Sequence, residues 1–260
     1  MAGERQLFQD CSLSFANDIL HAIRQASSWA ALRAITRDFT DAIGFRYFAL
    51  ITHEDLRDPR PGAIDLRDYA EGAARRIIGE CSYLRDPVIR GAIFADCAYL
   101  WSDLHRLIRL DNRDRIALEL GKREGLDQGI TVPCSRLGQR LGSCTFAGLK
   151  TARCAELMLG PAQMFGIFAF QRARSLAGRP YLPAQPPRLE PRYRDCVVLA
   201  GQGLRDKVIA HKLGLTPRTV ESYMRDARRL FGARDRTELV TAAVLAGEID
   251  LAELRSRQAP

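Results

Sequence analysis

The stretch from Gly203 to Gly232 constrains the fold of this 260-residue chain more than any other part of the sequence. Two short amphipathic helical patterns lie here, and Gly214 separates them. Thr216 is a predicted N-cap, and Pro217 suits the first helical position, where a missing N–H is tolerated. The pattern therefore predicts two helices joined by a very short turn.

The two predicted helices have different buried and exposed faces. The first has its apolar positions at Val208, Ile209 and Leu213. The second would bury, at helical spacing, Val220, Met224, Ala227 and Phe231. Its other face is mostly cationic and consists of Arg218, Thr219, Glu221, Ser222, Arg225, Arg228 and Arg229. A basic helix after a tight turn fits a DNA major groove, although a solvated helical hairpin can share this pattern.

Residues 189–240 resemble the DNA-binding domain of LuxR-type transcription regulators. The residues at that family's spacing are Gly203, Ile209, Ala210, the run LGLTPRTV from Leu213 to Val220, Gly232, Arg236 and Thr237. The resemblance implies a four-helix unit that binds double-stranded DNA. Three positions depart from the family pattern: Leu204 replaces a Lys, Val208 an acidic residue and Tyr223 a His.

Charge and composition agree with a nucleic-acid partner. The chain has 39 basic and 31 acidic side chains, a net charge of +8, and residues 188–247 alone contribute 12 minus 7, or +5. No run of about 18 apolar residues and no signal peptide is present, so we expect a cytoplasmic protein without a membrane partner. The seven cysteines lack a CxxC pair and the four histidines are isolated, so reduced thiols are expected and no metal site.

The first part of the chain mixes helical and strand patterns. Helices are predicted at 12–23, 29–42, 68–80, 86–94 and 113–124, and a long one at 152–176 is interrupted near Gly160 and Pro161. Strands are predicted at 46–52, 129–134 and 143–148. This order predicts an α/β/α sandwich around an antiparallel sheet. We place this domain at 1–176, a proline-rich linker at 177–187 and an all-α helix-turn-helix domain at 188–260.

Within the first domain, three features resemble the autoinducer-binding domain of the same family. They are Asp86 before Pro87, Trp101, and the segment GITVP that starts at Gly129. The resemblance implies a pocket for an N-acyl homoserine lactone, with Tyr69, Asp86, Trp101 and Gly129 as ligand-binding residues. Two further pocket positions depart from the family pattern, with Ala73 where Trp is usual and Ile77 where Tyr is usual.

The chemistry of such a ligand explains the residue types. Asp86 can accept a hydrogen bond from the amide N–H, and Tyr69 can donate one to a carbonyl. Each residue also has a structural interpretation, because an Asp before Pro commonly caps a helix and a Trp is commonly core. Ala73 and Ile77 would leave extra volume, which favours a long-chain or aromatic acyl group.

These patterns together predict a quorum-sensing transcription regulator controlled by an acylated effector. The alternative is a solo regulator of the same fold that is ligand-independent or responds to another small molecule. We expect no enzyme activity, because no Ser-His or Cys-His signature is present, and no cofactor apart from the effector. A homodimer on a palindromic site is expected, formed by Met158, Met164, Phe165 and Phe168 and by residues 239–245.

Overall fold

The computed structural model describes residues 13–55, 57–69, 71–75, 85–135, 141–150, 155–178 and 187–255. The chain divides into two compact units, Met1–Tyr181 and Leu182–Pro260. Most of the predicted linker, residues 179–186, lies outside the described residues. Within the described residues, no helix is both long enough and apolar enough to cross a membrane.

A five-stranded antiparallel sheet forms the centre of the first unit, with the order β2-β1-β5-β4-β3. Its strands are β1 (Phe45–Thr52), β2 (Asp65–Asp68), β3 (Tyr99–Leu100), β4 (Gly129–Pro133) and β5 (Gly142–Leu149). The sequence pattern did not predict the two edge strands. β2 reads DLRD, with one apolar residue among three charged ones, as edge strands often do, and β3 has only two residues.

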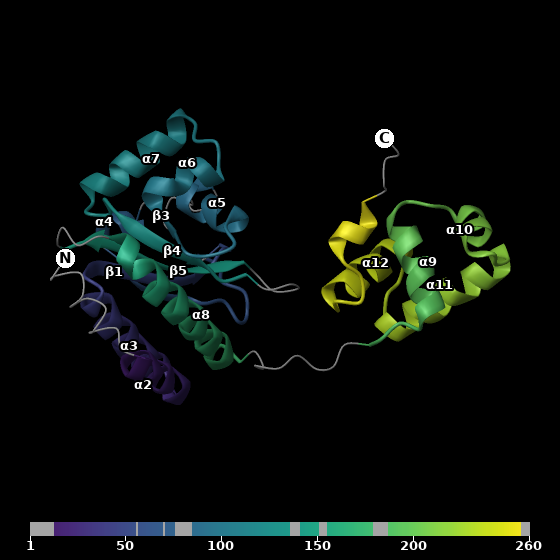
Figure 1. Cartoon of the computed structure of the whole chain (residues 1–260), viewed down its shortest axis with the longest axis horizontal. Helices are drawn as coiled ribbons and strands as arrows, with labels where there is room; N and C mark the ends of the chain where they lie inside the picture. Colours follow the sequence, from purple (N-terminus) through teal and green to yellow (C-terminus); the bar gives the residue numbers. More distant parts are fainter. Residues whose placement is uncertain are drawn as a thin grey trace. The chain divides into compact units, whose positions relative to one another are not determined.

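Helices cover both faces of this sheet, which confirms the predicted sandwich (Figure 1). One layer consists of α2 (Leu13–Gln25), α3 (Trp29–Ala42) and α8 (Leu159–Leu176). The other consists of α5 (Pro87–Phe94), α6 (Leu104–Leu107) and α7 (Asn112–Arg123). A short helix, α4 (Glu71–Ala74), follows β2, so the helix predicted from 68 is wrong at its start; residues 76–84 lie outside the described residues.

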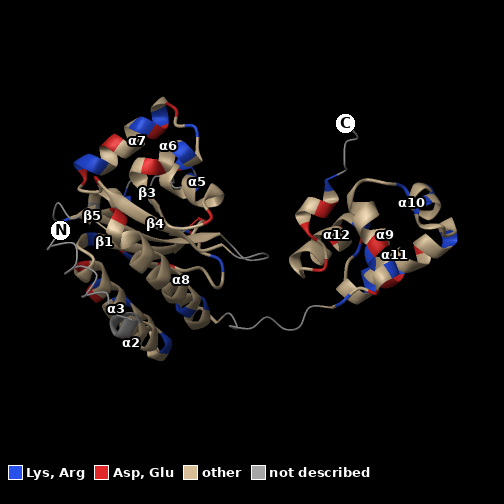
Figure 2. Ribbon diagram, in the orientation of Figure 1, with Lys and Arg blue, Asp and Glu red and all other residues tan. Residues whose placement is uncertain are grey.

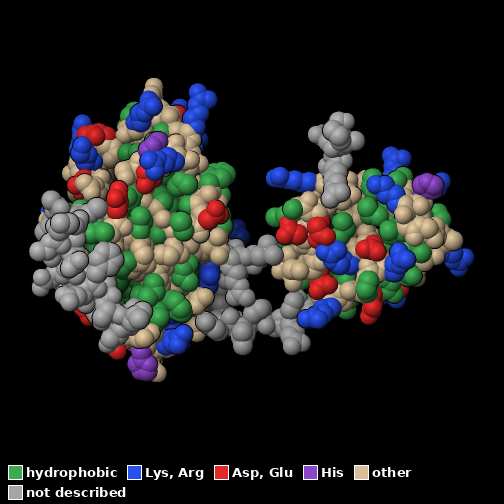
Figure 3. All heavy atoms as spheres, viewed as in Figure 1, with side chains coloured by type: hydrophobic (Ala, Val, Ile, Leu, Met, Phe, Trp, Pro, Cys, Tyr) green, Lys and Arg blue, Asp and Glu red, His purple; other side chains and the backbone are tan. Residues whose placement is uncertain are grey.

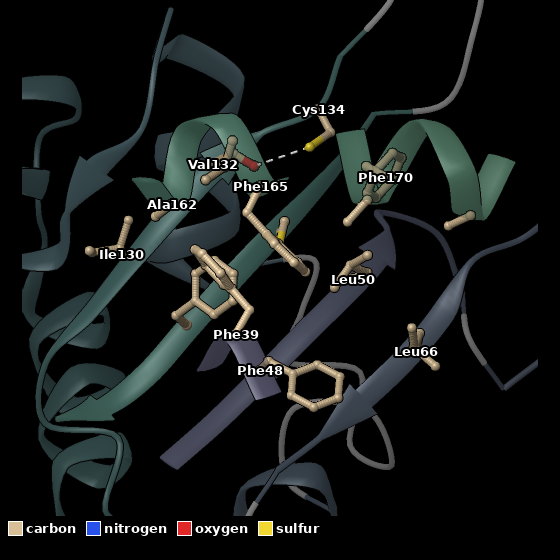
Figure 4. Packing of buried hydrophobic residues seen from close by; sticks show 14 of the residues in the cluster. Phe39, Phe48, Leu50, Leu66, Ile130, Val132, Cys134, Ala162, Phe165 and Phe170 are labelled. Carbon is tan, nitrogen blue, oxygen red and sulfur yellow. Dashed lines mark hydrogen bonds between the residues drawn. The ribbon is translucent and has the colours of Figure 1, made fainter. Parts of the chain in front are cut away.

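The main core lies between the sheet and the layer of α2, α3 and α8 (Figure 4). Alternate strand residues such as Phe48 and Phe146 point into it. Phe39 of α3 stacks on Phe165 of α8, with ring centroids 4.0 Å apart and planes 10° apart. Because Phe165 and Met158 are buried in this core, the prediction that they form a dimer surface is wrong for these two residues.

The start of α8 differs from the sequence prediction for a local reason. A 3-10 turn, η4 (Ala155–Met158), precedes the helix, which begins at Leu159. Pro161 therefore lies in the first turn of α8 instead of interrupting a longer helix. Proline is tolerated there because the first amides of a helix have no intrahelical acceptor.

The second unit is helical, as predicted. It contains α9 (Pro191–Gly201), α10 (Asp206–Leu213), α11 (Pro217–Phe231), α12 (Arg236–Leu245) and the 3-10 turn η5 (Leu251–Leu254). Ile209 and Ala210 are buried in its core, whereas Val208 is 43% exposed, so the expected packing role of Val208 is wrong. Leu239, Ala243 and Val244 of α12 also belong to this core.

The end of the second unit is tied back to its first helix. Arg194 of α9 donates to both carboxylate oxygens of Glu253 in η5, at 2.8 and 2.6 Å, and its Nε donates to the Glu248 carbonyl at 2.8 Å. Gly201 approaches the side chain of Leu254 so closely that a Cβ there would lie 2.5 Å from Leu254 Cδ2. The segment after α12 is therefore part of the folded unit.

Candidate functional site

A small cavity of about 50 Å³ lies between the sheet face opposite the main core and helices α5 and α7. Tyr69, Asp86 and Trp101, which the sequence predicted as ligand-binding residues, all border it. Tyr69 directly follows β2, Asp86 directly precedes α5, and Trp101 directly follows β3. The fold thus brings three residues that are far apart in sequence to one place.

Asp86 has a structural role as well as a place on the cavity wall. It is the N-cap of α5, and its Oδ1 accepts from the backbone N–H groups of Val88 at 2.9 Å and Ile89 at 3.3 Å. Pro87 occupies the first helical position. The capping interpretation of this Asp-Pro pair is therefore confirmed, and the ligand-binding role stays a prediction.

Tyr69 presents a neutral phenol to the cavity. Burial raises the pKa of its hydroxyl above the ordinary value, and the nearby Asp86 carboxylate raises this pKa further. The phenol keeps its proton at neutral pH and can donate a hydrogen bond to a carbonyl oxygen.

The indole of Trp101 is anchored to the sheet by a chain of hydroxyl groups. Its Nε1 donates to Thr131 Oγ1 at 2.9 Å, and Thr131 Oγ1 lies 3.1 Å from Thr145 Oγ1. An indole N–H can only donate, so Thr131 accepts from Trp101 and its own proton can go to Thr145. The hydroxyl group of Thr145 also lines the cavity. Trp101 therefore presents its ring surface to the cavity, while its N–H is bound to Thr131.

Gly129 belongs to the packing of Trp101 and not to the wall of this cavity. A Cβ at Gly129 would lie 2.5 Å from Trp101 Cε2, so only glycine lets the indole lie flat against β4. Gly129 instead lines an outer groove on the other side of Trp101. Gly129 does not border the small cavity, so a direct ligand contact for Gly129 stays a prediction.

The structure also differs from the expectation of extra volume at Ala73. Ala73 is fully buried in a cluster with Leu126 and Ala147, and Tyr47 and Tyr69 pack against it. Neighbouring side chains thus fill the space that an indole would occupy, and Ala73 does not border the cavity in this arrangement. Ile77 lies outside the described residues.

Strand β5 provides a polar wall of the cavity that the sequence pattern did not predict. Ser143 and Thr145 line the cavity and are nearly inaccessible to solvent, while Cys144 and Phe146 between and beyond them face the main core. The signal that could have found them is the period-two alternation in GSCTFAGL, which places Ser143, Thr145 and Ala147 on one face. Buried hydroxyls on that face indicate a polar site.

An ion pair joins the two helices above the cavity. Arg90 of α5 donates to Asp114 Oδ1 of α7 at 2.7 Å. The Asp114 side chain is only 4% exposed and that of Arg90 is 36% exposed. Asp114 also forms a capping box with Asp111 at the start of α7. This contact fixes the spacing of α5 and α7 over the sheet.

Helix α11 in the second unit carries the predicted DNA-binding residues. Thr216 Oγ1 accepts from the Thr219 N–H at 3.1 Å, and Gly214 and Gly232 adopt left-handed conformations at the ends of α10 and α11. Val220, Met224 and Ala227 are buried, and Phe231 is half-buried against the same core. Figure 2 shows the basic residues of α10 and α11 on the ribbon, and Figure 3 shows basic and acidic side chains together on this unit.

The outward residues of α11 are not equivalent. Arg218, Glu221, Arg225 and Arg229 are exposed. Arg225 donates to Ser222 Oγ at 2.9 Å, and both Arg225 and Arg229 lie 3.9 Å from Asp226 Oδ1. In contrast, Thr219 is bound to the cap residue Thr216, and Arg228 turns back to the Met224 carbonyl at 3.4 Å.

Two departures from the family pattern are accommodated by packing. Tyr223 stacks at a tilt on Tyr193 of α9, with ring centroids 4.6 Å apart. Arg236, at the start of α12, donates to Asp206 Oδ1 at 2.7 Å and to the Leu204 carbonyl. Leu204 thus contributes its backbone to the joint between α10 and α12.

Comparison with known families identifies both units. Residues 28–173 match the autoinducer binding domain, and residues 188–243 match the bacterial regulatory proteins of the luxR family. The chain is a LuxR-family regulator. It is a transcription regulator of the quorum-sensing type, with an autoinducer-binding domain and a DNA-binding helix-turn-helix domain.

Individual relatives agree with this assignment of the LuxR-family regulator. The chain is 24% identical over 168 residues to the transcriptional activator protein VanR of Vibrio anguillarum. The matched region covers 64% of this chain and 68% of VanR. It shares its fold with Escherichia coli SdiA, with a TM-score of 0.57, 16% identity, and coverage of 91% of this chain and 98% of that one. A structure of SdiA in complex with octanoyl-rac-glycerol gives a TM-score of 0.55 at 16% identity, over 90% of this chain and 94% of that one.

Proposed function

We propose that a neutral acylated small molecule, in the first place an N-acyl homoserine lactone, controls this LuxR-family regulator by binding between the sheet and helices α5 and α7. The observation that supports this proposal is the convergence of Tyr69, Asp86 and Trp101 on one cavity. The SdiA fold neighbour, whose structure holds octanoyl-rac-glycerol, supports an acylated ligand more generally.

Each polar residue has a role that its chemistry allows. The Asp86 carboxylate accepts from the ligand amide while it caps α5. The Tyr69 phenol and the Thr145 hydroxyl donate to the ligand carbonyls, and the Trp101 ring covers the apolar part. Because these two hydroxyl groups are buried away from water, a ligand carbonyl that receives no hydrogen bond from them would weaken binding strongly.

Binding requires that the cavity expand. A volume of about 50 Å³ is far below the roughly 300 to 1,000 Å³ of typical small-molecule pockets. Leu118 and Leu126 separate the cavity from the outer groove together with Trp101, and α7 carries Leu118. A ligand would therefore shift α5, α7 or the Trp101 ring away from the sheet, and this change would transmit the signal.

The closed cavity also favours a second candidate function. Since Ala73 is packed and not bordered by open space, the chain could regulate transcription without a lactone, as a solo regulator with another effector or none. The two candidates differ in whether lactones stabilise the protein.

On the DNA side, we propose a homodimer that binds a palindromic site and acts in the cytoplasm, where its DNA target lies. One recognition helix reads only a few base pairs, so specificity requires a second half-site. Glu221, Ser222 and Arg225 would contact bases, and Arg218 and Arg229 would contact phosphates. Thr219 and Arg228, which are tied to their own helix, would have supporting roles.

The deciding experiment is thermal unfolding of the purified full chain with N-acyl homoserine lactones of different acyl lengths. A lactone at 100 times its dissociation constant should add about 2.7 kcal/mol to the free energy of unfolding. Asp86→Asn should abolish this gain but keep the fold, because Asn caps helices as well as Asp does. Asp111→Asn, which changes the cap of α7, is the matched control. Equal stabilisation of parent and Asp86→Asn, or none by any lactone in the parent, would favour the solo regulator.

A further inference from the structure

An acidic side chain lies among the basic residues on the outward face of α11. The side chain of Asp226 is 38% exposed, and its Oδ1 lies 3.9 Å from both Arg225 Nε and Arg229 Nη1. Its Oδ2 accepts from Ser222 Oγ at 3.4 Å. A carboxylate at this place repels the phosphates of a DNA backbone and by itself lowers affinity. Pairs three or four residues apart add little to the stability of a helix, so stability alone does not explain it.

Arg225, Ser222 and Asp226 form a closed ring of contacts. Arg225 Nη2 donates to Ser222 Oγ at 2.9 Å, while Arg225 Nε faces the carboxylate of Asp226. A guanidinium can only donate, so Ser222 accepts from Arg225 and its own single proton goes to Asp226. The direction of each hydrogen bond in the ring is therefore determined. Ser222 keeps one lone pair, which can still accept from a base.

The ring holds one edge of the Arg225 guanidinium and leaves another edge open. Nε and Nη2 form the held edge. Within the residues that the structure describes, Nη1 of Arg225 has no hydrogen-bond partner. Nη1 and the second proton of Nη2 therefore present two parallel donors at the end of a half-exposed side chain. Two such donors match O6 and N7 of guanine in the major groove.

The ring also restrains Arg225 before DNA binds. A long side chain loses rotamer freedom when it is fixed against a base, and this loss weakens binding. Because Ser222 and Asp226 already restrain Arg225, less freedom is lost on the correct site. On random DNA the guanine is absent from this position, whereas the charge of Asp226 still repels the backbone. Asp226 therefore favours specific over random DNA.

We propose that Asp226, through Ser222, positions Arg225 to bind a guanine in each half-site and lowers the affinity of the protein for random DNA. This inference rests on the proposed contact of Arg225 with bases. It adds the identity of one base and a role for an acidic residue of α11. Asp226 acts through Arg225 and is a positioning residue.

The test selects binding sites from a pool of random-sequence DNA duplexes with the full chain and measures the base preference at each position. The parent should select a palindrome with a guanine in each half-site, and Arg225→Ala should lose the preference at this guanine alone. Asp226→Ala should reduce the same preference about three- to tenfold, the worth of one hydrogen bond. Ser222→Ala should reduce it by a similar factor, because it also opens the ring.

A second measurement separates the charge of Asp226 from its place in the ring. Asp226→Ala should bind a random-sequence duplex about threefold more tightly and with a steeper salt dependence, because one repulsive charge is gone. Ser222→Ala keeps every charge and should not show this increase. Asp195→Ala on α9 is the matched control, because its carboxylate is 44% exposed and lies 4.0 Å from Arg192. It should keep the base preference of the parent and change the affinity for random DNA less than Asp226→Ala.

Failure of the proposed function and failure of this inference give different results. The inference requires both changes in Asp226→Ala, so the absence of either one, in a parent that selects a palindrome, overturns it. A guanine preference that survives in Arg225→Ala overturns it as well. If the parent selects no sequence, the proposed DNA recognition and this inference fail together. Thermal unfolding identifies any variant that does not fold, and Asp226→Asn, which keeps the size of the side chain and loses its charge, then provides the comparison.

Discussion

His53 makes the stability of the first unit depend on pH in a defined window. Burial lowers the pKa of His53 to about 4 in the folded chain, from 6.5 in an unfolded one. Between these values the unfolded state binds more protons than the folded state. The contribution of His53 to the free energy of unfolding is therefore fully present above pH 6.5 and is lost as the pH falls toward 4. The expected loss is about 3 kcal/mol. Urea unfolding at several pH values measures it.

A matched variant isolates this contribution. His53→Gln should flatten the pH dependence between 4 and 6.5, whereas His21→Gln, at an exposed histidine of α2, should leave the curve of the parent unchanged. An equally steep curve in His53→Gln would mean that other groups cause the acid sensitivity.

Two arginines of α11 should have different effects on DNA binding. Arg225 is held by Ser222 near the middle of the exposed face, so Arg225→Ala should lower affinity for the specific site more than for random DNA. Arg229→Ala should weaken both equally and reduce the salt dependence by about one charge. Mobility shifts at several salt concentrations measure these effects. Equal losses on both DNAs for both variants would contradict the assignment.

The sequence predicted candidate site residues where a motif contains them. Tyr69, Asp86 and Trp101 could be predicted because each matches a family position, and the fold does bring them together. The contact between His53 Nε2 and Ser143 Oγ, which are 3.0 Å apart, could not, because it depends on the register of β1 with β5 and on burial. Ala73 was misjudged because a small side chain leaves a space only if its neighbours do not fill it.

Among the elements, those with strong local signals were predictable. The start and end of α11 follow from Thr216, Pro217 and Gly232, whose side-chain and backbone properties act within a few residues. β2 and β3 were missed because their pairing with neighbours, and not their composition, makes them strands.

At the same scale, the ion pair between α5 and α7 should be important for stability. Asp114→Ala removes a buried carboxylate, its capping box and the partner of Arg90, and should cost about 2 to 4 kcal/mol. Asp103→Ala, which removes the more exposed pair with Arg106, should cost less than about 1 kcal/mol. Chemical denaturation compares the two. Similar small losses would show that Arg90 and Asp114 do not hold the helices.

For the whole molecule, the dimer surface that we propose on α8 is narrower than the one predicted from the sequence. Phe168 is half-buried, with the Arg24 guanidinium 5.7 Å from its ring centre, and Met164 is also half-buried. Phe168→Asp should therefore yield a folded monomer in light scattering at micromolar concentration. Phe165→Ala should instead lower the free energy of unfolding of the domain by about 3 to 5 kcal/mol, because Phe165 lies in the core. A dimeric Phe168→Asp protein would place the interface elsewhere.

The contact between Trp101 and Gly129 has a consequence for the evolution of this site. The two positions lie on adjacent strand ends, and the indole leaves no room for a Cβ on its partner. Neither residue can vary alone: a larger residue at 129 would displace the ring, and a smaller one at 101 would open a path from the outer groove to the cavity. We expect these positions to covary among homologues, with substitutions of Gly129 confined to chains that have also replaced Trp101.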